Sequence, residues 1–178
     1  MDRETAVQLA KDNYWRVGLS ALSLNELCRR VQLSKPALYR EFGGEDGLLA
    51  AALDAYRAQV LVPMLSGLEE DRPFADMVEG VIVVLTSDRG TPAGCLFTKA
   101  RISPSRLGPL AKEQVEQMTA EHRAAYEAWF RRALAKEEAN PELSPELAAL
   151  YVDTQVAAIL VQMGIGIEPE RIRAQARL

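Results

Sequence analysis

Histidine and cysteine are scarce in this sequence of 178 residues. It holds one histidine, His122, and two cysteines, Cys28 and Cys95, which lie far apart and show no Cys-x-x-Cys or other metal-ligand spacing. A zinc site or a Ser–His–Asp triad would have to be built around that single imidazole. We therefore expect no metal site, no catalytic residues and no cofactor, and we do not expect an enzyme.

Long apolar runs and a secretion signal are also missing. No uninterrupted apolar run approaches the ~20 residues that a membrane-spanning helix needs, and the longest candidate is VIVVL at 81–85. The first residues, MDRETAVQLAKDNYW, lack the basic start, apolar middle and small-residue cleavage site of a secretory signal. We expect a cytoplasmic protein without a membrane partner.

The alternation of apolar and polar residues that is typical of β-strands is absent, and nearly every segment has helical spacing. The sequence predicts an all-α fold with two domains. A three-helix domain over residues 1–45 would be joined by a long fourth helix to a bundle over residues 46–178. Within the bundle, residues 74–87 are apolar on most sides and are expected to be buried, whereas His122 lies on a charged helix and is expected at the surface.

Two short helices near the N-terminus carry the most informative pattern. Ser23 and Glu26 form a capping box at the start of a helix over about residues 23–31. After a tight turn, Ser34 is a good N-cap for a second helix, which ends at Gly43–Gly44. Two helices joined by a tight turn, the second short and basic, form a helix-turn-helix, which lays its second helix in the major groove of DNA.

The residue types on the outer face of the second helix suit contact with DNA. Lys35 and Arg40 can neutralise phosphates or bind guanine edges, and Tyr39 can hydrogen-bond a phosphate oxygen. Pro36 and Ala37 are compact apolar groups of the kind that pack on a thymine methyl. The predicted DNA-binding residues are Ser23, Ser34, Lys35, Pro36, Ala37, Tyr39 and Arg40. The alternative is a connecting helix whose polar face is only solvated.

The stretch SLNELCRRVQLSKPALYREFGGEDGLLAAAL, residues 23–53, resembles the DNA-binding region of the tetracycline-repressor (TetR) family of bacterial transcription regulators. The residues that carry the resemblance are Gly18, Ser23, Leu33, Ser34, Lys35, Leu38, Tyr39, Phe42, Leu48 and Leu49. The resemblance implies a homodimer formed by the last two long helices and a pocket in the bundle for a small-molecule ligand. We expect a repressor that binds a palindromic double-stranded DNA operator and is released by that ligand.

The segment after the second helix departs from the family's pattern. Where the family usually has a lysine that contacts a phosphate, this sequence has Glu45, followed by Asp46, and Glu41 lies just behind the outer face. Three carboxylates that face a polyanion would lower its affinity. Either they point away from the DNA, or binding depends on the dimer and on Arg29, Arg30 and Lys35.

Residues for the other functions are predicted from their helical positions. Apolar and aromatic side chains on the helices expected to enclose the pocket indicate an apolar or aromatic ligand. They are Met77, Val81, Val84, Leu85, Phe97, Met118, Tyr126, Trp129 and Phe130. A stripe of mixed small and large residues suits a helix in a four-helix dimer interface. It consists of Leu147, Leu150, Tyr151, Thr154, Ala157, Ala158 and Val161. Each set could instead be plain core.

Two other classes of protein stay open at this point. A small-molecule-binding or enzymatic bundle with a weakened DNA-binding head would suit the acidic residues at 41–46. A protein-interaction module would use residues 35–42 as a partner-binding helix. Cys95 opens a short helix, where a lowered thiol pKa could make it a redox sensor; the alternative is a small buried residue.

Overall fold

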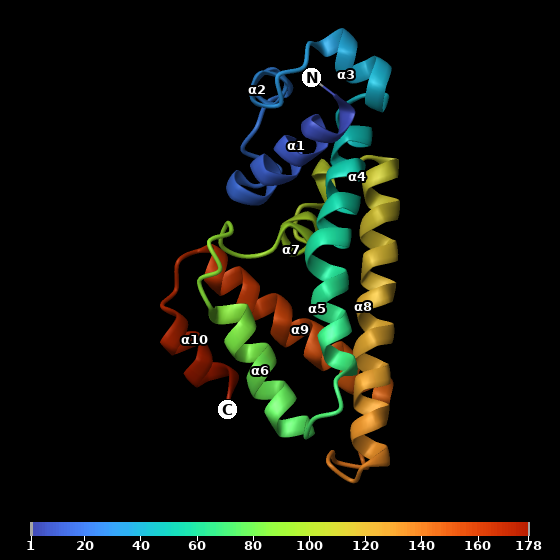
Figure 1. Cartoon of the computed structure of the whole chain (residues 1–178), viewed down its shortest axis with the longest axis vertical. Helices are drawn as coiled ribbons and strands as arrows, with labels where there is room; N and C mark the ends of the chain where they lie inside the picture. Colours follow the sequence, from blue (N-terminus) through green and yellow to red (C-terminus); the bar gives the residue numbers. More distant parts are fainter. Residues whose placement is uncertain (1, 178) are drawn as a thin grey trace. The chain divides into compact units, whose positions relative to one another are not determined.

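Helices account for all regular secondary structure between residues 2 and 177, the part of the chain that this computed structural model describes. In chain order they are α1 (Arg3–Val17), α2 (Leu24–Arg30), α3 (Lys35–Phe42), α4 (Glu45–Tyr56), η1 (Arg57–Leu61), α5 (Val62–Ser66), η2 (Gly67–Glu69), α6 (Phe74–Thr86), α7 (Leu96–Arg101), η3 (Pro104–Arg106), α8 (Pro109–Ala135), α9 (Pro145–Gly164) and α10 (Pro169–Ala176) (Figure 1). The predicted all-α class is confirmed. Because η1 is a turn of π-helix, α4, η1 and α5 form one uninterrupted helical stretch.

The helices form two compact units, and the chain passes between them more than once. The first unit contains the residues up to 61 together with 95–118, and the second contains 62–94 together with the residues from 119 onward. The first unit extends beyond the predicted boundary at residue 45, because α4 packs along α1 and also against α7. The division of function at residue 45 stays a prediction.

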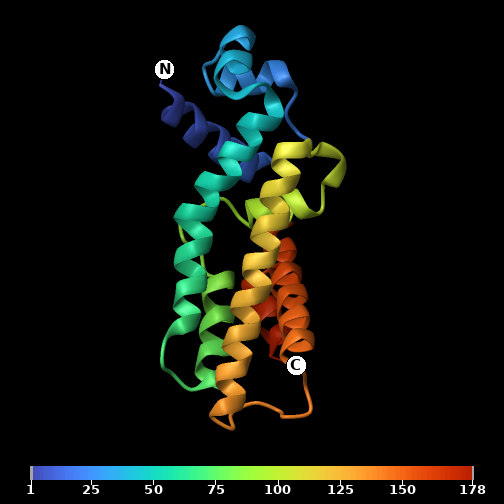
Figure 2. The ribbon, with the colours of Figure 1, turned by 90° about the vertical axis from the view of Figure 1, so that its right-hand side faces the viewer.

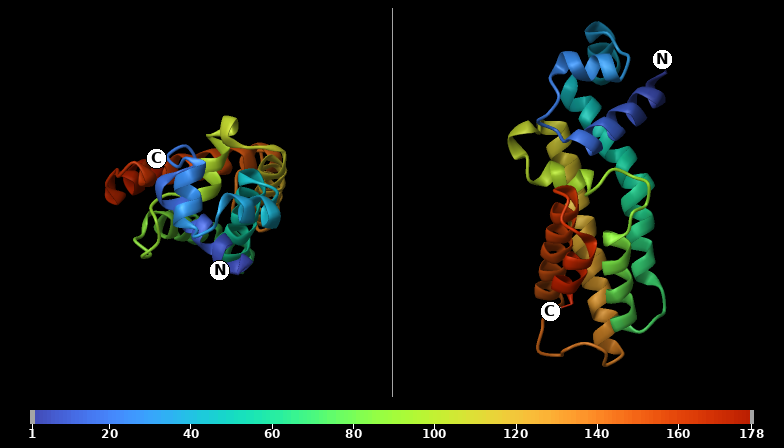
Figure 3. Two further views of the ribbon diagram at one scale, coloured as in Figure 1. Left: turned by 90° about the horizontal axis from the view of Figure 1, so that it is seen from above. Right: turned by 90° about the vertical axis from the view of Figure 1, so that its left-hand side faces the viewer.

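In the first unit, α1 and α3 both pack on α4, and α2 packs on α1 and α3 (Figure 3). Apolar residues from all four helices meet in the core of this unit. Those with no exposed surface include Ala10, Leu27, Leu38, Leu48, Ala52 and Leu53. Burial of a leucine side chain is worth roughly 1.5–3 kcal/mol relative to exposure, so this core, rather than helix propensity, holds the seven- and eight-residue helices α2 and α3 in place.

Buried polar contacts tie α7 into the same unit. The Nζ of Lys99 on α7 donates to the backbone oxygen of Trp15 on α1, and burial lowers the pKa of this lysine. The ring of Trp15 meets that of Tyr56 edge to face at 4.9 Å. The hydroxyl of Tyr56 donates to the Sγ of Cys95, 3.2 Å away, and Cys95 is buried. Cys95 therefore serves as a packed N-cap of α7.

In the second unit, α10 packs on both α6 and α9 (Figure 1). Ile172 on α10 is 1% exposed, and the Nε of Arg173 donates to the Oγ1 of the buried Thr86 at the end of α6, at 2.7 Å. At the start of α6, the ring of Phe74 lies tilted against that of Trp129 of α8, with ring centroids 4.9 Å apart. Helix α6 is thus held from both ends.

Two expectations about burial in the second unit are wrong in part or in full. Helix α6 is buried on one side only, and Val83 and Val84 are 40% and 43% exposed. His122 was expected at the surface but is 4% exposed. The reason is its register on the 27-residue helix α8 (Figure 2): it follows the buried Met118 by four residues and precedes the buried Tyr126 by four, so all three share the inward face.

Two helical stretches are long and apolar enough to cross a membrane by length and composition alone, although neither contains a long uninterrupted apolar run. They are residues 45–69, of whose apolar window 33% is buried, and 145–164, of whose window 28% is buried. Core helices of soluble proteins can have the same length and composition, so these two stretches are weak evidence for a membrane span. The low buried share of the second stretch means that much of α9's apolar surface is uncovered by the chain itself.

Candidate nucleic-acid interface

Helix α3 presents a polar face outward because its two largest apolar residues point into the core. Leu38 is fully buried and Phe42 is 8% exposed. On the opposite side Tyr39 is 57% exposed. None of the predicted DNA-binding residues is in the core: Ala37 is half-buried, and the others are exposed, namely Ser23, Ser34, Lys35, Pro36, Tyr39 and Arg40. The structure therefore places five of the seven along α3 on its outward side, while the two serines precede α3 and α2.

Both serines are N-caps, as the sequence predicts. The Oγ of Ser34 accepts from the backbone N–H of Ala37 at 3.3 Å, and the Oγ of Ser23 accepts from that of Glu26 at 3.2 Å. A capping hydroxyl keeps its own proton, which is free to be donated to a phosphate oxygen. Gly43, with φ of 74°, ends α3 in the left-handed conformation that glycine adopts without strain.

Most cations near α3 are already engaged in ion pairs. The carboxylate of Glu26 accepts from Arg29 at 2.5 Å and from Arg30 at 2.6 Å, and these hydrogen bonds lower the pKa of Glu26. Arg40 pairs with Glu41 at 2.8 Å. Lys35 has no carboxylate at ion-pair distance among the described residues. Arg29 and Arg30 are thus less available to DNA than the sequence alone suggests.

The acidic residue Asp46 is directed at the N-terminus of α8. Its Oδ2 accepts from the backbone N–H of Leu110 at 2.9 Å, and its Oδ1 accepts from that of Ala111 at 3.2 Å. A carboxylate at this end of a helix satisfies free N–H groups and interacts favourably with the helix dipole. Gly108 leaves room for it, since a Cβ there would lie 2.4 Å from the Cγ of Asp46.

Glu45, at the position where the family usually has lysine, pairs with Arg106 at 3.2 Å. Together with the Asp46 cap, this pair joins the start of α4 to residues 106–111. Two of the three carboxylates that could repel DNA therefore have partners within the first unit, and the third, Glu41, is paired with Arg40. The sequence offered no signal for these partners, because they lie more than 60 residues away along the chain.

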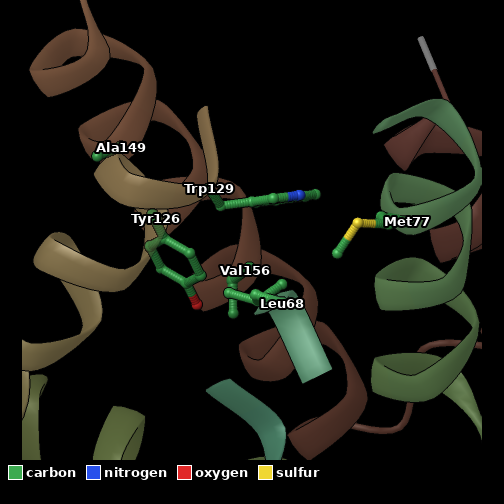
Figure 4. Packing of buried hydrophobic residues seen from close by; sticks show 6 residues of the cluster. All are labelled: Leu68, Met77, Tyr126, Trp129, Ala149 and Val156. Atoms are coloured by element: carbon green, nitrogen blue, oxygen red, sulfur yellow. The ribbon is translucent and has the colours of Figure 1, made fainter. Parts of the chain in front are cut away.

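The predicted ligand-pocket residues are divided between the two units. Met77, Tyr126 and Trp129 belong to one buried cluster in the second unit (Figure 4), and Val81 and Leu85 pack against it. Phe130 is buried nearby and contacts the ring of Phe74 edge to face. Phe97 and Met118 are buried in the first unit, and Val84 is exposed. A pocket role for each residue stays a prediction.

The predicted dimer residues lie on one side of α9, which is largely uncovered. Leu147, Leu150 and Tyr151 are 56%, 47% and 65% exposed. Thr154 and Ala158 are also exposed, and Ala157 and Val161 are half-buried. The opposite side of the helix, with Ala148, Ala149, Asp153, Val156 and Ile159, is buried in the second unit. The predicted stripe is thus not plain core of a single chain.

Comparison with known proteins agrees with this geometry. A sequence model described as "Bacterial regulatory proteins, tetR family" matches residues 7–52. The chain is 27% identical to the HTH-type transcriptional repressor ComR of Escherichia coli K12 over 169 residues, 92% of this chain and 78% of that protein. It is 29% identical to the repressor BdcR of the same organism over 96 residues, about half of each chain.

Solved structures show the same fold. The regulator CifR, as a cysteine mutant complexed with 26-bp double-strand operator DNA, is 25% identical, with a TM-score of 0.79 over 99% of this chain and 94% of that one. The reduced form of E. coli NemR, at 16% identity, has a TM-score of 0.79 over 98% of this chain and 94% of its own. The second likeness concerns the fold alone.

Helices α2 and α3 thus form the helix-turn-helix of a DNA-binding transcription regulator, with the polar side of α3 turned outward. The DNA-binding region of the chain, residues 7–52, belongs to the TetR family of bacterial regulatory proteins. Its relatives are regulators of transcription and not enzymes. The predicted family and the predicted lack of enzymatic activity are confirmed by these relatives.

The Asp46 cap leads to a prediction about stability. Replacing Asp46 with alanine leaves two N–H groups of α8 without their acceptor, so we expect the free energy of unfolding to fall by about 1–2 kcal/mol, the usual cost of losing a cap. Urea unfolding of the full chain measures this. Asp54, an exposed carboxylate on the same helix with only a long ion pair to Arg57, is the matched control; Asp54→Ala should change stability by less than about 0.5 kcal/mol. Equal effects of the two changes would contradict the capping role.

Proposed function

We propose that this protein is a homodimeric, cytoplasmic repressor that binds a palindromic operator through α3 and is released when a small molecule binds in the second unit. The DNA-binding part of this proposal rests on the outward face of α3. Lys35, Tyr39 and Arg40 lie on that face, while Leu38 and Phe42 fix the helix from below. The repressors ComR and BdcR and the operator complex of CifR support the same assignment.

In the proposed complex, α3 lies in the major groove with its N-terminal side chains at the base edges. Lys35, with no carboxylate partner among the described residues, is suited to a phosphate or to the acceptor atoms of guanine. Gly44 leaves room for Tyr39, since a Cβ at that position would lie 3.3 Å from the tyrosine ring.

The first test is a footprint and mobility shift on DNA upstream of the protein's own gene, at two salt concentrations. We expect a protected palindrome and a shift that weakens as salt rises, because binding displaces counterions from phosphates. Lys35→Ala and Tyr39→Ala should each weaken binding by about 1–3 kcal/mol. Lys112→Ala, on the exposed surface of α8, should leave it unchanged.

The outcomes of these experiments distinguish a DNA-binding repressor from the alternative class of protein. No protection and no shift at low salt would favour a small-molecule-binding bundle with a weakened head over a repressor. Binding that survives both alanine changes on α3 would mean that another face contacts the DNA.

The exposed side of α9 supports the proposed homodimer. Leu147, Leu150 and Tyr151 give an apolar face of which about half is left uncovered by the described residues of the chain. Small residues at 154, 157 and 158 let a second helix approach closely. To match a palindrome, a twofold dimer has to present two recognition helices about 34–36 Å apart, one turn of DNA, or a multiple of that distance.

The dimer face yields a prediction about mass. Leu150→Glu places a charge in the proposed interface, where it would lose its water without gaining a partner, so we expect the chain to sediment as a monomer. Gln175→Glu on the exposed side of α10 adds the same charge elsewhere and should leave a dimer. A wild-type chain that sediments as a monomer at micromolar concentration would contradict this face as the dimer interface.

The ligand site is proposed in the buried cluster of the second unit. The indole Nε1 of Trp129 is buried and has no hydrogen-bond acceptor among the described residues. Figure 4 shows the edge of the indole that carries this nitrogen directed toward Met77, with Tyr126 nearby. An unpaired buried donor costs about 1–3 kcal/mol, and an apolar or aromatic ligand with one acceptor atom would supply the missing partner. Release then follows if the ligand favours a conformation in which α4 no longer holds α3 in register with DNA.

Fluorescence tests this position for the ligand. The sequence has two tryptophans, so Trp15→Phe leaves Trp129 as the remaining one. In this variant, any compound that releases the operator should quench or shift the tryptophan emission with the same midpoint as the release. Release without a change in emission would place the ligand elsewhere. Trp129→Phe should raise the concentration needed for release by roughly tenfold, the equivalent of one lost hydrogen bond to a buried donor.

A further inference from the structure

A groove of about 460 Å³ lies beside the outward face of α3 in the first unit. Asp2, Arg3 and Ala6 from the start of α1 line one side of it, and Ser34, Ala37 and Arg40 line the other. Three of the residues predicted to contact DNA therefore form one wall of a groove whose other wall comes from a helix outside the helix-turn-helix. No motif in the sequence points to α1.

Arg3 is held in position in this groove. Its guanidinium carbon lies 5.0 Å from the centroid of the Phe42 ring, the geometry of a cation–π contact. Phe42 is itself anchored in the core, at 8% exposure. A guanidinium over a ring face keeps its N–H groups free at its edge, where they can form two parallel hydrogen bonds to a phosphate.

Arg3 also differs from its neighbours in charge pairing. Arg29 and Arg30 share Glu26, Arg40 has Glu41, and Lys11 has Asp12 at 3.4 Å. Within residues 2–42, the cations without a carboxylate at ion-pair distance are Arg3, Arg16 and Lys35. Of these three, Arg3 is the one that lines the groove.

We propose that this groove accepts a phosphodiester of the DNA backbone beside the base pairs that α3 contacts, and that Arg3 is its phosphate ligand. The proposal rests on the proposed function, in that α3 faces DNA. It assigns part of the affinity for DNA to α1, a helix outside the helix-turn-helix. Two carboxylates also line the groove: Asp2, which caps α1 by accepting from Thr5 at 2.8 Å, and Glu41, which pairs with Arg40 at 2.8 Å.

The test compares charge variants of the full-length protein on a protected operator fragment and on a random-sequence duplex of equal length. Arg3→Gln should weaken binding to both by about five- to tenfold at 0.1 M salt, and reduce the slope of log K against log salt by about 0.9, the value for one phosphate. Arg3→Lys keeps the charge and should keep the slope. Asp2→Asn, which still caps a helix well, should strengthen binding to both duplexes.

Arg16→Gln is the matched control, because it removes an unpaired cation from the same helix, 13 residues or about 20 Å further along. The proposal would be overturned if Arg3→Gln kept the wild-type affinity, salt slope and melting temperature while Lys35→Ala still weakened binding. If Arg3→Gln does not fold, an unchanged affinity for Asp2→Asn would overturn it. If the wild-type protein binds neither duplex at low salt, the proposed function itself fails.

Discussion

The burial of Leu38 and Phe42 is the contact on which the DNA-binding head depends. An isolated helix of eight residues is not stable in water, so α3 exists as a helix only while these two side chains fill the core under it. Their burial turns Lys35 and Tyr39 outward, and the Phe42 ring also supports the guanidinium of Arg3. Core packing and the charge at the surface are therefore linked through one aromatic residue.

Pairing within the head, rather than its net charge, decides which charges can meet DNA. The carboxylates that looked unfavourable in the sequence are bound: Glu45 by Arg106 and Asp46 by the N–H groups of α8. The same principle makes Arg29 and Arg30 less available to DNA, because both hold Glu26. A polyanion approaching α3 meets the few cations that have no internal partner, which is why affinity in such a head should respond to single charges.

The features that could be predicted from the sequence are those decided by residues close together along the chain. The caps by Ser23 and Ser34 and the end of α3 at Gly43 are decided within four residues, and the structure has them where the sequence puts them. The Asp46 cap and the burial of His122 depend on residues far along the chain or on the register of a long helix, so composition and charge gave no reliable guide. The exposure of Val84 likewise reflects which helices happen to cover α6.

In helix α9, too, the rest of the chain decides which apolar residues are covered. Its apolar residues run all around the helix, yet only one side is covered by the chain, and 28% of its apolar window is buried. A soluble protein rarely leaves such a face open to water, because each uncovered leucine forgoes about 1.5–3 kcal/mol of burial. The proposed second copy of the chain would recover that energy. It would also bring two α3 helices into one assembly, as binding to the two halves of a palindrome requires.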